Sequence, residues 1–111
     1  MFPQIKPKQL WIGVVEVRPL AGCNVFDETQ GAFVEIVAWA ASAYEYGRKV
    51  SLIVKELRLF VLAVENVEPV EQRRAREGYL EECVEDIIFE AHDNPDAITY
   101  GAFHTYEKAD V

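Results

Sequence analysis

Few side chains in this sequence could do acid-base chemistry near neutral pH, and the two histidines are the first to consider. His104 lies between Phe103 and Thr105 in a segment with strand character, and beside Tyr100 it could act as a general base in a pocket. A hydrogen-bonded histidine at a sheet edge is the more common role. The sequence contains no G-x-S-x-G, P-loop, G-x-G-x-x-G or H-E-x-x-H motif. We therefore expect no catalytic residue, and an enzyme that uses His104 is only a second alternative.

Metal and thiol chemistry find little support in the spacing of the candidate ligands. His92 stands among acids, but no second histidine lies at a ligand spacing from it. Cys23 and Cys83 are far apart in the chain and form no C-x-x-C pair, which argues against zinc and against a disulfide scaffold. We expect two free thiols, no metal site and no cofactor.

The acids are concentrated between residues 77 and 96, a segment with eight acids and neither lysine nor arginine. Several of them stand at i, i+4 spacing on a predicted helix, and each such like-charge pair costs roughly 0.2 to 0.5 kcal/mol. The segment is either a solvated surface or a binding surface for a basic protein. The candidate interaction residues, named here the acidic face, are Glu77, Glu81, Glu82, Glu85, Asp86 and Glu90.

The charge of the whole chain restricts its partners. With 11 basic and 19 acidic residues, the chain has a net charge of -8, so phosphates and anionic lipids repel it. We expect no nucleic acid and no membrane as partner. Residues 1–9 lack the apolar run of a signal peptide, and the longest apolar run, 59–64, is far shorter than the roughly 18 to 20 residues that span a membrane. These features predict a cytoplasmic protein.

The elements that must position these residues belong to one domain. A chain of 111 residues with 50% hydrophobic residues has the size and composition of a single core. We expect a single α+β domain over residues 1–111, with an N-terminal tail at 1–8. The pattern of apolar residues predicts strands at 9–19, 49–55, 57–67 and 97–106 and helices at 28–46 and 69–93, with Gly78 bending or dividing the second helix.

The segment 28–46 has two competing interpretations. Its opening alternates like a strand, but its alanines and a stripe at helical spacing favour a helix capped by Asp27 and ended by Gly47. The alternative is a helix that Ser42 caps, with Glu45 completing the cap, and that runs to residue 58, so that 31–40 becomes a strand. The alternative places Gly47 inside a helix at a cost of roughly 1 kcal/mol. The turn between residues 55 and 58, which the first interpretation requires, carries no glycine, proline or asparagine.

The preferred order of elements is β-α-β-β-α-β, which resembles the ferredoxin-like pattern. This architecture implies a four-stranded antiparallel sheet with the first and third strands in the centre and both helices on one face. The opposite face would expose an apolar patch that monomers usually avoid, unless Lys49 and Lys55 lie over it. The patch consists of Leu10, Ile12, Val14 and Ile53.

The sequence therefore predicts a small acidic cytoplasmic protein-interaction domain. We expect a homodimer formed through the open sheet face. A basic protein partner at the acidic face is the second expected contact, as in an inhibitor or immunity-type protein that neutralises a cationic enzyme. The first alternative is a small-molecule binding module with an apolar cleft at the sheet face.

Overall fold

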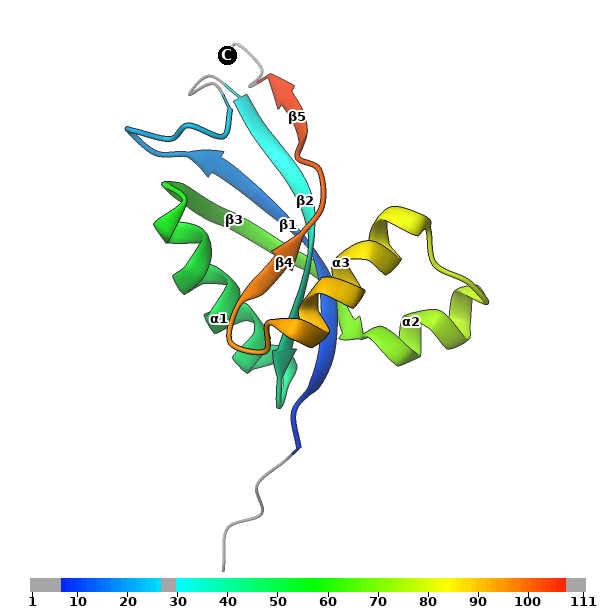
Figure 1. Cartoon of the computed structure of the whole chain (residues 1–111). Coiled ribbons are helices and arrows are strands. Elements are labelled where there is room, and N and C mark those ends of the chain that lie inside the picture. The colour runs from blue at the N-terminus through cyan, green and yellow to red at the C-terminus, as the bar shows by residue number, and fades with distance from the viewer. Residues whose placement is uncertain (1–6, 27–29, 108–111) are drawn as a thin grey trace, which may run out of the picture.

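The computed structural model describes residues 7–26 and 30–107 and has a mixed α+β architecture (Figure 1). Strands and helices alternate irregularly along the chain, which begins with two consecutive strands and ends with two short ones. The elements are β1 (Gln9–Pro19), β2 (Gln30–Ala40), α1 (Ala43–Glu56), β3 (Leu59–Pro69), α2 (Val70–Glu77), α3 (Glu82–Asp93), β4 (Ile98–Tyr100) and β5 (His104–Glu107).

The sheet is antiparallel, as predicted, but its strand order is not ferredoxin-like. The order is β3-β1-β2-β4, and β5 also pairs with β2 beyond β4. β1 and β2 form the centre because each also has a partner on its other edge, β3 for β1 and β4 and β5 for β2. They pair with each other from Gln9 opposite Ala40 to Val17 opposite Ala32. The predicted third strand corresponds to β3, which lies at one edge of the sheet instead of its centre.

The helix predicted over residues 28–46 is wrong, and the alternative interpretation is correct. Residues 30–40 form β2, and α1 begins after Ser42, whose Oγ accepts a hydrogen bond from the backbone N–H of Glu45 at 3.1 Å. β2 is central and largely buried on both faces, so it lacks the polar alternation that marks a half-exposed strand. Asp27, the predicted cap, lies outside the described residues.

The strand predicted at 49–55 is also wrong, because these residues form the second half of α1. Tyr46, Val50 and Val54 recur at four-residue spacing and are buried against the sheet, which outweighs the cost of Gly47 within the helix. The turn into β3 uses Arg58 at a φ of 60°. Asparagine and glycine are the usual residues in that left-handed region, so the sequence gives this turn no recognisable mark.

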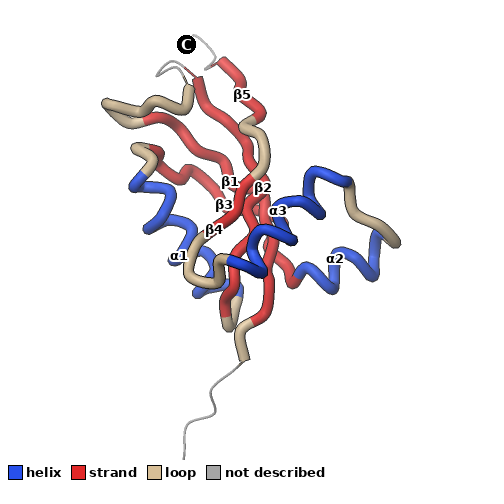
Figure 2. Tube along the Cα trace, in the orientation of Figure 1, coloured by secondary structure: helices blue, strands red, loops and turns tan. Residues whose placement is uncertain are grey.

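The two sides of the sheet carry different helices, which corrects the prediction that both helices cover one face (Figure 2). Val15 and Val17 of β1 lie in the core with α1, whereas Leu10 and Ile12 lie in a second core with α3. Successive side chains of a strand point to opposite faces, so one strand supplies both cores.

The second predicted helix is divided at Gly78, as the sequence suggested. Gly78 has a φ of 80°, a conformation that glycine adopts without steric cost, and it ends α2 by donating its N–H to the carbonyl of Arg74. α3 then folds back and buries Val84, Ile87, Ile88 and Ala91. In the part of the chain that the structure describes, none of the helices combines the length and apolar character needed to cross a membrane.

Candidate functional site

The four residues predicted to form an open apolar face do not lie together on the surface. Ile12 is 0% exposed and Leu10 is buried beside it, both in the core under α3. Ile53 belongs to α1 and packs against the core on the other side of the sheet. Val14 is half-buried in β1. The expected patch is absent because α3 covers the face that the sequence analysis left open.

The predicted acidic face is brought together around α3. The buried stripe of α3 faces the sheet, so its acids point outward, and four of the six predicted residues belong to this helix. Glu81 precedes the first residue of α3, and Glu77 is the last residue of α2.

Arginines of α2 neutralise part of this face. Arg74 forms an ion pair with Glu85 at 2.5 Å, and Arg76 forms one with Glu77 at 3.6 Å. Sequence reasoning missed the pair of Arg74 with Glu85 because the two residues meet only after the chain turns at Gly78. Arg76 and Glu77 are consecutive residues of α2. Glu82, Asp86 and Glu90 form no ion pair with another described residue. The uncompensated charge is therefore concentrated on one i, i+4 row of α3.

Two exposed aromatic side chains accompany these acids, and sequence reasoning missed both. Tyr79 is 77% exposed and Phe89 is 75% exposed. At 100° per residue, Phe89 falls opposite the buried stripe and between Glu85 and Glu82 on the helical projection. Its position outside the apolar stripe was the available signal. The α3 surface is defined here as Tyr79, Glu82, Asp86, Phe89 and Glu90.

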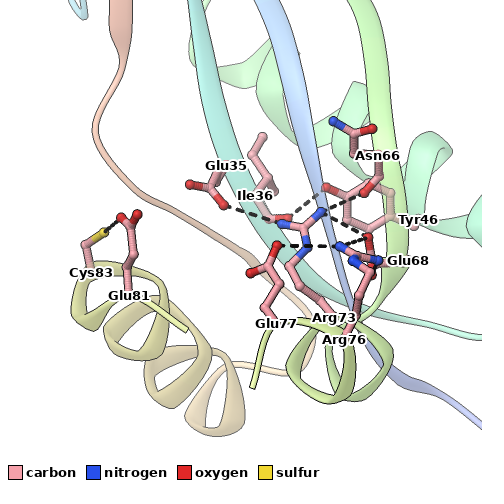
Figure 3. A network of polar contacts seen from close by, with 10 residues as sticks. All are labelled: Glu35, Ile36, Tyr46, Asn66, Glu68, Arg73, Arg76, Glu77, Glu81 and Cys83. Atoms are coloured by element: carbon pink, nitrogen blue, oxygen red, sulfur yellow. Dashed lines mark hydrogen bonds and ion pairs between the residues drawn. The ribbon is translucent and has the colours of Figure 1, made fainter. Parts of the chain in front are cut away.

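A second cluster of charges lies between α2 and the sheet (Figure 3). Buried Arg73 donates to the Asn66 carbonyl at 2.8 Å and to Glu68 at 3.4 Å, and it forms an ion pair with Glu35 at 3.5 Å. Arg76 donates to both carboxylate oxygens of Glu68, at 2.5 and 3.1 Å. The network joins three elements, β2, β3 and α2.

The electrostatics of this network stabilise the packing of α2 on the sheet. The hydrogen bond from Arg76 lowers the pKa of Glu68, and this effect exceeds the opposing effect of burial. Nearby, the Tyr46 hydroxyl donates to the Ile36 carbonyl at 2.7 Å, and burial raises the pKa of Tyr46. Both groups keep their ordinary ionisation state at neutral pH. The contacts of Glu68 hold α2 on the sheet, and the hydrogen bond of Tyr46 holds α1 on β2.

The histidines and cysteines are not brought into a common site. His104 is exposed on β5 opposite Phe33, and its ring makes no hydrogen bond or ion pair with another described residue. The rings of His92 and Trp39 are nearly perpendicular, at 74°, with their centroids 5.5 Å apart. Cys23 and Cys83 are free thiols. Within residues 7–26 and 30–107, no group of three or more His, Cys, Asp or Glu side chains is placed to hold a metal ion.

A further exposed apolar region lies on the other side of the sheet, where α1 meets β3. Tyr44 and Leu52 project from α1 beside the half-buried Val61 and Val64 of β3, and Leu62 is exposed at the edge of β3. Phe60 is exposed on the opposite face of the sheet, where its ring lies against Arg18. Shallow grooves run between the helix and the strand. We name this region the edge surface, defined by Tyr44, Arg48, Leu52, Val61, Leu62 and Val64.

Comparison of the chain with protein-family models, with curated proteins and with solved structures found no match. The function must therefore be argued from the chemistry of the surfaces.

Proposed function

We propose that this chain is a protein-interaction domain that binds a basic protein partner through the α3 surface. The observation that carries the proposal is Phe89, a large aromatic side chain 75% exposed on the outward side of an acidic helix. Aromatic residues are enriched among the side chains that supply most of the binding energy in protein interfaces. Tyr79 offers a second such side chain where the chain enters α3.

The surrounding charge sets the chemistry of the partner. Glu82, Asp86 and Glu90 lie on the outward side of α3 without an ion pair to another described residue, so they attract lysine and arginine. The long side chains of lysine and arginine also have apolar stems that can pack on an aromatic ring, and their cationic groups interact favourably with its face. A basic protein can thus satisfy both features of the surface. An inhibitor of a cationic enzyme is one form that such a domain takes.

The two alternative functions have less support. The sheet face on which a ligand cleft was expected is covered by α3 over Leu10 and Ile12. An enzyme that uses His104 lacks a second group, because no described carboxylate, thiol or hydroxyl is hydrogen-bonded to its ring.

The proposal is tested by capturing proteins from a lysate on the immobilised chain and on two variants of the α3 surface. The wild type should retain a basic protein at low salt, and retention should fall as salt rises because exposed charges are screened over about 8 to 10 Å near physiological ionic strength. Phe89→Ala and the double variant Glu82→Lys, Asp86→Lys should each weaken the affinity at least about tenfold.

Phe60→Ala is the matched control, since it removes an exposed phenylalanine from β3 instead of α3. It should leave retention unchanged. If the wild type retains no basic protein, or if Phe89→Ala binds as well as the wild type, the α3 surface is only a solvated face and the proposal fails.

A further inference from the structure

The outer edge of β3 is unusually apolar for the edge of a sheet. Within the described residues β3 pairs only with β1, so its other edge has no strand partner. Natural edge strands are commonly protected by charges, prolines or short length. β3 has 11 residues, and its first half, Leu59 to Val64, carries neither charge nor proline.

A bulge increases this apolar exposure. The pairing of β1 with β3 shifts between Glu16 and Val17, so that Leu62 has no partner in the register. A bulged residue breaks the alternation of a strand and re-aims its side chain, and Leu62 is 45% exposed. Because the bulge disturbs the regular backbone geometry of β3, another strand cannot pair evenly along this edge. Contacts at this edge must therefore come mostly from side chains.

Leu52 is the centre of the edge surface. One groove is lined by Tyr44, Arg48 and Leu52 of α1 together with Val64 and Val67 of β3. The next groove along the strand is lined by Leu52 and Lys55 together with Leu59, Phe60 and Val61. Leu52, which is 64% exposed, borders both grooves. It therefore lies at the level of Leu62, midway along the apolar part of the edge.

Two opposite charges on α1 stand at equal distance from Leu52. Arg48 stands four residues before it and Glu56 four residues after it, so the three side chains form one ridge of the helix. Arg48 and Glu56 are both exposed, and neither forms an ion pair with another described residue. A helix that crosses this ridge in the opposite direction, with its own Leu52 at the crossing, brings Arg48 opposite Glu56 twice.

We propose that the occupant of the edge surface is a second copy of this chain, docked α1 against α1 around a two-fold axis at Leu52. In such an isologous contact each surface must complement itself, and the ridge of Arg48, Leu52 and Glu56 satisfies that condition. The exposed apolar side chains of α1 and β3 are removed from water in the same contact.

The distribution of charge makes a contact between two copies less repulsive at this surface than at the α3 surface. Residues 43–58 contain four basic and two acidic side chains, although the whole chain has a net charge of -8. Because α1 and α3 lie on opposite sides of the sheet, contact through α1 keeps the two acidic α3 surfaces apart. The proposal thus keeps the homodimer that the sequence predicted, but its contact is formed by the edge surface instead of the sheet face.

The test is the solution mass of the purified full chain and its variants at micromolar concentration. The wild type should have about twice the mass of one chain, which is 12.6 kDa. Arg48→Glu places two acids opposite each other, and Glu56→Arg places two bases opposite each other, so each variant alone should be monomeric.

Mixing the two single variants should restore a dimer. In an equimolar mixture, the acids of the Arg48→Glu chain face the arginines of the Glu56→Arg chain at both positions, so a heterodimer should form. The double variant Arg48→Glu, Glu56→Arg should also recover the dimer. Rescue by mixing requires that both variants are folded, so a loss of dimer through misfolding cannot imitate it.

Leu52→Lys should give a monomer with unchanged helix content, and Glu82→Lys on the α3 surface should leave the dimer intact. A wild-type mass of 12.6 kDa overturns the proposal, as does a dimer that survives Arg48→Glu and Leu52→Lys. A mixture of the two charge variants that remains monomeric also overturns it, because another surface or another partner then covers the edge.

Discussion

Glu68 is a buried carboxylate held by two arginines of the following helix. Its hydrogen bonds to Arg76 and Arg73 lower its pKa below the usual 4.5, with Arg76 the larger cause. A carboxylate whose pKa is lower in the folded state stabilises the fold above the unfolded pKa. That contribution is lost as the pH falls from about 4.5 through the folded pKa.

Glu68→Gln should lower the free energy of unfolding at pH 7 by about 1 to 3 kcal/mol, because two guanidinium groups lose a charged acceptor. As the pH falls below about 4.5, the wild type should lose this advantage and approach the variant. Urea denaturation across this pH range measures the difference. Glu65→Gln, an exposed acid on the same strand, should change stability by less than about 0.5 kcal/mol. A constant difference between wild type and Glu68→Gln down to pH 3 would show that the pair is not ionic.

The Ser42 hydroxyl caps the first turn of α1. Ser42→Ala should therefore lower the free energy of unfolding by about 0.5 to 2 kcal/mol, because the N–H of Glu45 loses its acceptor. Ser51→Ala, an exposed serine in the middle of the same helix, is the control and should change stability by less than about 0.5 kcal/mol. Equal effects of the two substitutions in denaturant melts would argue against the cap. The sequence analysis assigned this role to Asp27, which cannot cap a helix that begins at Ala43.

At the scale of elements, α3 is attached to the sheet by bonds between residues far apart in the chain. The Trp39 indole N–H of β2 donates to the carbonyl of Ala91 at 2.9 Å, and the Thr99 hydroxyl of β4 donates to the carbonyl of Ile87 at 2.7 Å. Together with the buried stripe, these bonds fix which side of α3 faces water. They therefore place the acids and Phe89 on the same outward side.

The acid row on α3 has an energetic consequence that can be measured. Asp86 stands four residues from both Glu82 and Glu90, so Asp86→Lys removes two repulsive pairs and creates two attractive ones. Each pair is worth roughly 0.2 to 0.5 kcal/mol, so the four changes together should make the variant more stable by about 0.8 to 2 kcal/mol at low salt. The gain should fade as salt screens the charges.

Thermal melts at low and high salt test this prediction. Glu65→Lys, which reverses an exposed acid on β3, is the matched control and should not show a gain of this size. A loss of stability in Asp86→Lys would mean that Asp86 has a partner that the described contacts do not include.

At the scale of the whole molecule, the sheet separates two surfaces of opposite character. α1 presents the more basic segment and α3 the acidic one, on opposite sides of β1 and β2. Binding at one surface therefore leaves the other accessible. A dimer formed through the edge surface would present two α3 surfaces, and a partner with two basic sites would gain avidity from that arrangement.

The sequence alone determined those elements that local patterns define without ambiguity. The β-branched run at residues 9–19 has the bounds of β1, and Gly78 and Asp93 mark the division and end of the second helical segment as observed. These features depend on nearby residues, because strand alternation, left-handed glycine and a following proline act over a few positions. The concentration of acids was also visible in the sequence, because these acids lie within one short segment.

Only the tertiary structure decided the segment 30–56 and the side on which each helix lies. Helix propensities differ by tenths of a kcal/mol per residue, whereas burying a valine or isoleucine contributes about 1.5 to 3 kcal/mol. Val34, Ile36 and Val37 gain that burial between two helices, so β2 forms despite its alanines. Whether Ile12 faces solvent or α3 depends in the same way on contacts with distant parts of the chain.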